Sequence, residues 1–325
     1  MKVLVTGSSG YIGGRLARAL AERGYAVTGM DRRSAGAACL DAFVHADLRE
    51  TTPLADALAD ADAVFHLAAA RADFGIPDRE YRRDNVEATR ALIELGRKAG
   101  VRQWVFYSSV SAMGPGAASR NESASPSPAN PYGATKAEAE ALFRRLADED
   151  PSVAILVMRP SVVYGPGNSA DTNVYRLIRA IDRRRFLMVG DGQTPKTLSY
   201  VENLLAATLF AWERIQPGLQ TYIYVDAPVL TTGEIVERIC LLLGRHIPRW
   251  RVPLGLATAL ASSLDVLGTA TGIDFPVTAA RIRKFCTPTN FDAEAIRELG
   301  FRAPVSNTAA LEATIRWYRS LAARP

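Results

Sequence analysis

A glycine-rich turn between a short apolar strand and a helix opens the chain, and this order limits the folds that it can adopt. The turn carries Gly7, Gly10 and Gly13, which follow a β-branched run and precede a helical pattern. Glycines let the backbone turn tightly and approach a pyrophosphate, to which the free amides of a helix N-terminus can donate. A second strand over residues 25–30 ends at Asp31, where a carboxylate can accept hydrogen bonds from ribose hydroxyls. The segment therefore predicts a dinucleotide site.

The residues that follow this acid leave the choice of dinucleotide open. The acid repels a 2′-phosphate and favours NAD, whereas Arg32 and Arg33 could bind the additional phosphate of NADP. A third strand over residues 42–46 leads to Asp47 and Leu48, where a carboxylate would meet adenine. A turn or helix N-cap acid is the alternative interpretation of this aspartate.

Apolar runs and helical patterns alternate through the first third of the chain. Residues 63–70 predict a buried strand that ends in small residues, residues 78–99 an amphipathic helix and residues 103–107 the next strand. This alternation is typical of a parallel sheet whose ligands bind at the carboxyl ends of its strands. His66 is better explained as a packed core histidine than as a catalytic one. The stretch over residues 114–130, rich in Gly, Ala, Ser and Pro, predicts a binding loop rather than a linker.

The second half of the chain no longer alternates in this way. We predict an α/β fold, with a Rossmann-type doubly wound parallel sheet over residues 1–168 and a smaller, mostly helical C-terminal substrate lobe over residues 169–325. Part of this lobe is expected to return to the sheet through short strands such as residues 221–225. Its helices are expected near residues 172–185, 201–213, 231–243, 254–267 and 307–322.

The composition excludes several classes of protein. A hydrophobic fraction of 48% and a charged fraction of 22% indicate an ordinary globular chain without a disorder signature. The first residues lack the pattern of a secretion signal, and three distant cysteines fit a reducing compartment, so we expect a cytoplasmic protein. The apolar stretch over residues 252–272 contains Asp265 and several Ser and Thr, which predicts a buried or interfacial helix and no membrane span.

The formal net charge of +5 invites a comparison with nucleic-acid-binding proteins. The basic residues occur as scattered pairs and one triplet, Arg183 to Arg185, without the interleaved aromatic residues of a base-stacking surface. We therefore expect no nucleic-acid partner. A positive field would instead attract a phosphorylated small molecule.

Tyr132 and Lys136 are the pair of residues most suggestive of chemistry. A spacing of four places both side chains on one face of a helix, and Pro131 suits the first turn of that helix. A nearby ammonium favours the phenolate, so we expect it to lower the tyrosine pKa toward neutrality, as a general acid or base requires. On its own the spacing is more often that of a solvated helix face, so the prediction depends on the rest of the chain.

Further motifs occur in a fixed order along the chain, and together they carry a resemblance. They are Thr6-Gly-x-x-Gly-x-x-Gly13, Asp31, Asp47-Leu48, His66-Leu-Ala-Ala69, Asn85, Ser108-Ser109, Tyr132-x-x-x-Lys136 and Arg159-Pro-x-x-Val-Tyr-Gly-Pro-Gly167. In this combination the chain resembles the extended branch of the short-chain dehydrogenase/reductase superfamily. That branch contains sugar-nucleotide epimerases and dehydratases and their 3β-hydroxysteroid dehydrogenase relatives. The likeness covers essentially the whole chain.

The resemblance implies roles for individual residues. Tyr132 matches the catalytic acid/base, Lys136 its partner, which also holds the nicotinamide ribose, and Ser109 the residue that binds the reacting hydroxyl. The family further implies NAD as the cofactor, a nucleotide sugar as the substrate and a homodimer. Implied cofactor contacts are Gly7, Gly10, Tyr11, Ile12, Gly13, Asp31, Arg32, Asp47, Leu48, Leu67, Ala68, Ala69, Asn85, Ser108, Tyr132, Lys136, Pro160 and Val163. Implied substrate contacts are Ser109, Val110, Tyr132, Asn173, Arg176, Lys196 and Arg281.

Two departures from the family pattern bear on which activity is expected of this chain. Dehydratases of this branch carry an Asp-Glu pair after the catalytic Ser or Thr, where this chain has Val110 and Ser111, so a dehydratase is disfavoured. Lys196 stands where an arginine usually binds the nucleotide diphosphate, and lysine keeps the charge without the bidentate geometry.

Three functions remain to be compared. The first is a C4-epimerase of a nucleotide-linked sugar that retains NAD through a keto intermediate. The second is an NAD(P)-dependent dehydrogenase or reductase of a hydroxysteroid-like or other apolar secondary alcohol, which the apolar run over residues 252–267 favours. The third, a dinucleotide sensor or scaffold, is disfavoured because Ser109, Tyr132 and Lys136 are all present.

Overall fold

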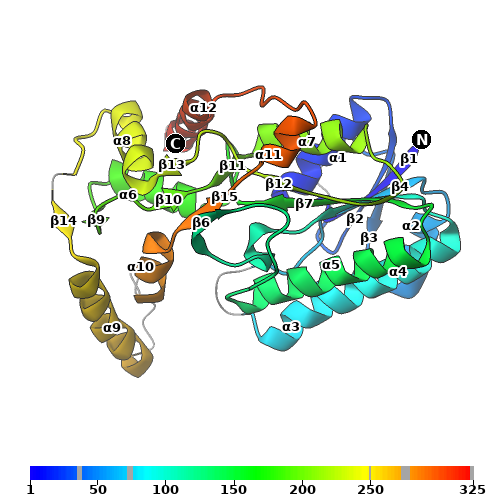
Figure 1. The fold of residues 1–325 in the computed structure, drawn as a ribbon, viewed down its shortest axis with the longest axis horizontal. Coiled ribbons are helices and arrows are strands. Elements are labelled where there is room, and N and C mark those ends of the chain that lie inside the picture. The colour runs from blue at the N-terminus through cyan, green and yellow to red at the C-terminus, as the bar shows by residue number, and fades with distance from the viewer. Residues whose placement is uncertain (35–38, 72–75, 249, 272–278, 323–325) are drawn as a thin grey trace.

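A seven-stranded parallel sheet forms the centre of the computed structural model, which describes residues 1–34, 39–71, 76–248, 250–271 and 279–322. The strand order is β12-β7-β5-β4-β1-β2-β3, and every neighbouring pair is parallel (Figure 1). This confirms the predicted α/β class with a doubly wound sheet. The strands are β1 (Lys2–Thr6), β2 (Ala26–Asp31), β3 (Ala42–His45), β4 (Ala63–His66), β5 (Gln103–Tyr107), β7 (Ala154–Pro160) and β12 (Gly218–Tyr224).

The order of the strands reverses between β1 and β4. The chain first runs outward from β1 to β3 and then crosses to the other side of β1 to form β4. Ligands of open α/β sheets bind at such a reversal, outside the carboxyl ends of the strands. Gly7 follows β1 there, Ala68 lies just beyond β4 and Ser108 follows β5. The topology therefore brings the predicted site residues to one edge of the sheet.

Helices cover both faces of the sheet (Figure 1). Side chains alternate along β5, so Trp104 and Phe106 face one core while Val105 and Tyr107 face the other. Phe143 stacks on Phe106 with the ring centroids 4.9 Å apart. One face packs against α2 (Thr51–Leu58), α4 (Ala88–Ala99) and α5 (Pro131–Glu149), and the other against α1 (Tyr11–Ala21), α7 (Val201–Trp212) and α11 (Glu294–Glu298).

The helix predicted over residues 78–99 is continuous but not uniform. It consists of α3 (Asp78–Arg82), a π-helical turn η1 (Arg83–Glu87) and α4. π-Turns widen a helix locally and occur often at functional sites. Here the turn contains Asn85, whose buried side chain donates to Thr135 near the start of α5.

The prediction of a loop over residues 114–130 is wrong in part. The strand β6 (Gly116–Arg120) lies within it and pairs with β15 (Thr289–Phe291), at the edge of a four-stranded sheet ordered β13-β10-β15-β6. The pairing partner comes from far along the chain, so no local pattern could indicate it. The other two strands are β10 (Pro195–Lys196) and β13 (Leu230–Thr231).

The remaining elements lie mostly at one end of the molecule (Figure 1). Two small parallel pairs join β8 with β11 and β9 with β14. No helix in the described ranges combines the length and the apolarity needed to cross a bilayer. These elements are η2 (Val110–Ala112), β8 (Val162–Tyr164), α6 (Asn173–Asp182), β9 (Met188–Val189), β11 (Leu198–Tyr200), α8 (Thr232–Leu243), β14 (Arg251–Val252), α9 (Leu254–Thr271), α10 (Ala279–Cys286) and α12 (Asn307–Ala322).

Candidate active site

The first turn of α5 presents the tyrosine that the sequence singled out. Asn130 caps this helix, and its side-chain oxygen accepts a hydrogen bond from the backbone N–H of Gly133 at 2.8 Å. Pro131 occupies the first helical position, where its missing N–H costs nothing. Tyr132 therefore projects from a well-defined helix start.

Tyr132 is hydrogen-bonded to Ser109, which follows β5. The Ser109 hydroxyl also accepts a hydrogen bond from the backbone N–H of Ser111 at 3.1 Å, which fixes its orientation. Burial raises the pKa of the Tyr132 phenol, while the charge of Arg71 and the bond to Ser109 act to lower it. The expectation that Lys136 brings this pKa toward neutrality is therefore wrong for the protein without its cofactor.

Lys136 lies one turn further along α5 and is almost completely buried. Its ammonium donates to the carbonyl oxygen of Tyr107 at 2.8 Å and lies 4.8 Å from the centroid of the Phe106 ring. The distance to the centroid of the Tyr132 ring is 5.9 Å. Burial lowers the pKa of Lys136 to about 7, although the nearby Glu140 opposes this shift. The lysine is thus held by the end of β5 rather than by the phenol.

A buried ion pair holds the residue that precedes Ser109 in place. Arg159, near the end of β7, donates from Nε and Nη2 to the two carboxylate oxygens of Glu140 at 2.9 and 2.6 Å. Ser108 donates its hydroxyl to the same carboxylate. The pair joins α5, β5 and β7 directly below Ser109. Sequence analysis missed Glu140, although its place four residues after Lys136 put it on the same helix face.

The glycine turn packs tightly against the segment that follows β4. Gly7 has a φ of +72°, and a Cβ added there would lie 2.7 Å from the backbone nitrogen of Ala68. A Cβ on Gly13 would collide with the carbonyl oxygen of Gly7. Only glycine fits these two positions, so the turn leaves its backbone open to a ligand. Within the described part of the chain, the buried hydroxyls of Ser8 and Tyr11 have no hydrogen-bond partner.

Acidic residues line the edge of this turn. The buried carboxylate of Asp31 accepts hydrogen bonds from the backbone N–H groups of Ser9 at 3.0 Å and Arg33 at 2.9 Å. The guanidinium of Arg33 lies 3.6 Å from the same carboxylate. Arg32 extends instead to Asp84, with 3.1 Å between the charged atoms.

Two further polar residues have protein partners that define their local roles. Asp47 accepts two side-chain hydrogen bonds from Arg49, each 2.8 Å, and these lower its pKa to about 2. The Asn85 side chain binds the backbone of Ala70 at 2.7 and 3.1 Å and donates to Thr135 at 3.0 Å. Asn85 therefore connects the segment after β4 to α5.

His66 is a packed core residue, as its position in a buried strand suggested. Its ring nitrogens lie 2.8 Å from the hydroxyl of Thr6 and 2.9 Å from that of Thr89. Burial, assisted by the charge of Lys136, lowers the pKa of His66 to about 3, so the ring is neutral. Among the other predicted cofactor residues, four pack in or against the cores: Ile12, Leu48, Leu67 and Val163. Gly10 caps the N-terminus of α1, Ala69 follows β4 and Pro160 ends β7.

The predicted substrate residues do not form a comparable cluster. Val110 belongs to the hydrophobic core, and Asn173 and Arg176 lie on α6, where Arg176 pairs with the exposed Asp171 at 3.3 Å. Lys196, on β10, donates to the carbonyl oxygen of Thr287. The side chain of Arg281 lies outside the described part of the structure.

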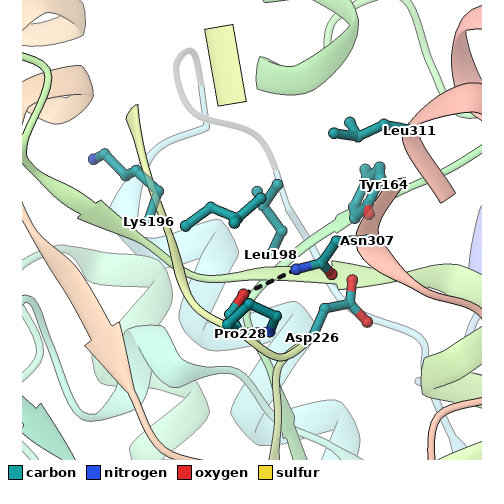
Figure 2. A pocket seen from close by; sticks show the side chains of 8 residues that line it. Tyr164, Lys196, Leu198, Asp226, Pro228, Asn307 and Leu311 are labelled. Atoms are coloured by element: carbon teal, nitrogen blue, oxygen red, sulfur yellow. Dashed lines mark hydrogen bonds between the residues drawn. The ribbon is translucent and has the colours of Figure 1, made fainter. Parts of the chain in front are cut away.

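A small hollow lies beside Lys196 in the second half of the chain (Figure 2). Asn307, from α12, donates to the carbonyl oxygen of Pro228 at 2.9 Å across it. The buried Asp226 accepts hydrogen bonds from Asn203 at 3.0 Å and from the Tyr224 hydroxyl at 2.9 Å. Burial raises the pKa of Asp226 against these bonds. The lining is Tyr164, Lys196, Leu198, Asp226, Pro228, Leu230, Asn307 and Leu311.

The model described as the NAD dependent epimerase/dehydratase family matches residues 3–225. The chain belongs to the NAD-dependent epimerase/dehydratase family. Its cofactor is accordingly NAD, in agreement with the prediction.

Relatives of this family member match over nearly its whole length. A curated protein of Escherichia coli O157:H7, N-acetyl-alpha-D-glucosaminyl-diphospho-ditrans,octacis-undecaprenol 4-epimerase, is 31% identical over 97% of this chain and 94% of its own length. The 3-beta-hydroxysteroid dehydrogenase of Mycolicibacterium neoaurum is 28% identical over 98% of this chain and 92% of its own. Among solved structures, MoeE5 in complex with UDP-glucose and NAD has a TM-score of 0.78 and 27% identity, covering 99% of this chain and 100% of that one.

The residues of this epimerase/dehydratase family member fit NAD. The cradle formed by Gly7 and Gly13 is what the close approach of a pyrophosphate requires, and α1 begins directly behind it with its free amides. Asp31, at the end of β2, is placed to accept from ribose hydroxyls.

Proposed function

We propose that this protein is an NAD-dependent epimerase that inverts C4 of a sugar carried on a nucleotide diphosphate. The observation that carries the proposal is the cluster of Ser109, Tyr132 and Lys136 at the carboxyl end of β5. The names of relatives support it: the E. coli protein is a 4-epimerase of a diphosphate-linked sugar, and MoeE5 binds UDP-glucose and NAD. The nonpolar Val110, where dehydratases carry an acid, argues against loss of water.

In the proposed cycle, Tyr132 moves the proton of the reacting hydroxyl. Ser109 holds the C4 hydroxyl while the Tyr132 phenolate accepts its proton, and a ketone forms at C4 as the C4 hydrogen leaves as hydride to the acceptor that NAD would supply. Bound NAD supplies the hydride acceptor and donor, and its positive nicotinamide ring favours the phenolate. The keto sugar then turns over in the site, and Tyr132 returns the proton once hydride has been added to the opposite face. Substrate and product have the same oxidation state.

The role of Lys136 in this cycle is to hold the cofactor. Its ammonium is fixed by the carbonyl oxygen of Tyr107, so it can donate further bonds to a ribose without moving. The ion pair of Glu140 with Arg159 keeps Ser108, and with it the neighbouring Ser109, in place. The chain therefore holds its proton-transfer group and its cation on α5 and its hydroxyl anchor at the end of β5.

The decisive experiment is an epimerisation assay with the purified protein. We expect interconversion of the C4 epimers of a UDP-hexose, its N-acetylated form or its uronic acid, without accumulation of NADH. Tyr132→Phe should reduce turnover by about 10²- to 10⁴-fold and leave NAD binding intact, because the phenol acts on the proton alone. Tyr25→Phe, which alters a ring packed on Trp212, is the matched control. Retention of most activity by Tyr132→Phe would remove Tyr132 from its role.

A dehydrogenase of an apolar secondary alcohol is the second candidate. The exposed leucines of α9 favour it, as does the similarity to a 3-beta-hydroxysteroid dehydrogenase. The same assay separates the two functions. Stoichiometric NADH production from an unlinked alcohol, with no epimer formed from any sugar diphosphate, would select the dehydrogenase.

A further inference from the structure

The helix α9 exposes apolar side chains that the fold leaves uncovered. It projects, together with α10, from the end of the molecule remote from the N-terminus (Figure 1). Leu256 and Leu260 lie one helical turn apart and are 55% and 59% exposed. Ala257 and Ala261 are buried and mark the side that faces the protein. An ordinary surface helix carries its leucines on the buried side. The exposed leucines of α9 therefore indicate that something outside this chain binds to them.

The strand pair before α9 extends this apolar area. β9 and β14 are parallel, with Arg251 opposite Met188, so the preceding residues, Trp250 and Leu187, are neighbours. They are 83% and 61% exposed. We call the whole set the docking surface. It consists of Leu187, Ile247, Trp250, Leu254, Leu256 and Leu260.

Positive charge lies at the rim of the docking surface. Arg183, Arg184 and Arg185 are exposed and immediately precede the segment that contains Leu187. Within the described ranges, no carboxylate forms an ion pair with any of the three. An exposed tryptophan beside leucines and arginines has the chemistry of a surface that lies in the headgroup region of an anionic membrane. The same positive rim opposes its own copy across a two-fold axis, which disfavours a dimer contact.

We propose that the docking surface binds the headgroup region of an anionic lipid bilayer. The chain then lies on the membrane without crossing it. Lys196 follows β9 by only a few residues, so the lobe that would hold a diphosphate is the lobe that carries this surface. Resting on the proposed C4 epimerisation, the inference adds a second substrate class to the nucleotide-linked sugars, namely a sugar diphosphate carried by a membrane lipid. The E. coli relative is a 4-epimerase of such a compound by its name.

Vesicle sedimentation with the full chain tests the proposal. We expect binding to vesicles of phosphatidylcholine mixed with phosphatidylglycerol, little binding to phosphatidylcholine alone, and weaker binding as salt screens the arginines. Leu256→Gln/Leu260→Gln should lower the partition coefficient by about tenfold or more, because two apolar side chains no longer enter the interface. Leu299→Gln alters an exposed leucine directly after α11, which lies away from α9 (Figure 1), and should bind as the unaltered chain does. Arg183→Gln/Arg185→Gln should reduce the preference for the anionic vesicles.

Three outcomes would overturn the proposal. The first is a protein that binds NAD but sediments with neither kind of vesicle. The second is equal vesicle binding by the unaltered chain and Leu256→Gln/Leu260→Gln. The third is conversion of a dimer to a monomer by this double substitution without any vesicle binding, which would identify a contact between copies of the chain. Since vesicle binding is measured without substrate, each outcome leaves the epimerase proposal to its own assay.

The substrate class has a separate readout. The unaltered chain should epimerise a sugar attached to a polyprenyl diphosphate in anionic vesicles, and Leu256→Gln/Leu260→Gln should lose most of that rate. The thermal shift produced by NAD should be the same for both proteins, which controls for folding. A chain that binds vesicles but turns over only UDP-sugars would overturn the assignment of the lipid-linked class.

Discussion

Glu140 and Arg159 form an ion pair that is buried on all sides, and its removal should be costly. Glu140→Gln leaves the guanidinium of Arg159 without its counter-charge and should destabilise the fold by about 3–5 kcal/mol. Glu149→Gln, on the same helix, breaks an exposed pair with Arg97 and should cost about 1 kcal/mol or less. Denaturant midpoints of the two variants provide the comparison. Equal midpoints would show that the buried pair contributes no more than a surface pair.

Lys136 should make stability depend on pH in the protein stripped of cofactor. Its pKa is about 7 in the fold and 10.5 in the unfolded chain, so between these values the unfolded state binds the additional proton. Stability from this residue therefore rises as the pH increases from about 7 to 10.5 and is constant below that window. Lys136→Met lacks the titrating group. The difference in melting temperature, unaltered chain minus variant, should increase across the window, and a flat difference would contradict the low pKa.

The residues of the site differ in how far sequence could predict their surroundings. Tyr132, Lys136 and Ser109 follow from local rules, because helix spacing and a strand end determine where they lie. The pKa of Tyr132 does not, since it depends on burial in the folded chain and on the charge of Arg71, which comes from another segment. The contact of Lys136 with the Tyr107 carbonyl is likewise tertiary.

At the scale of elements, the glycine turn needs Gly7 for two reasons: its φ is positive, and no Cβ fits beside the backbone of Ala68. Gly7 and Gly24 both have positive φ values, +72° and +81°, but only Gly7 faces another backbone segment. Gly24→Ala should therefore cost about 1–2 kcal/mol of strain and leave NAD binding unchanged. Gly7→Ala adds a collision with Ala68 that cannot relax by a side-chain movement. We expect it to abolish NAD binding in a titration, and normal affinity would show that the turn does not hold the pyrophosphate.

Some helices and strands could be predicted from local sequence patterns, and others could not. The start of α5 could be predicted because Asn130 and Pro131 are local signals for a helix N-terminus. β6 could not, because residues 116–120 become a strand only by pairing with residues 289–291. A return of residues 221–225 to the sheet could be expected, but the position of β12 beside β7 depends on pairing across the sheet. Pairing between strands that are far apart in the chain therefore cannot be predicted from a single sequence.

At the scale of the whole molecule, the two halves of the chain have different chemistry. The sheet brings Gly7, Asp31 and Ser109 to one edge, where the predicted dinucleotide site lies. The other end carries the exposed docking surface and its arginines. A chain with this division could bind its cofactor from solution and its substrate from a membrane, which neither half could do alone.

Cofactor binding should stabilise the entire fold and should distinguish NAD from NADP. A ligand at one hundred times its dissociation constant adds about 2.7 kcal/mol to the free energy of unfolding, which corresponds to a rise of several degrees in melting temperature. NAD should produce the larger shift, because the 2′-phosphate of NADP would add negative charge beside the buried carboxylate of Asp31. Arg33 is already paired with that carboxylate, and Arg32 with Asp84.

Asp31→Ser provides the complementary test of this preference. Removing the carboxylate takes away the repulsion and releases Arg33 to bind a phosphate, so the ratio of NADP to NAD affinity should increase by about tenfold or more. Glu22→Ser, an acid just beyond the end of α1, serves as the control and should leave the ratio unchanged. A larger melting shift with NADP than with NAD in the unaltered chain would mean that the two arginines outweigh the aspartate. The acid at the end of β2 would then orient the glycine turn through Ser9 without selecting the cofactor.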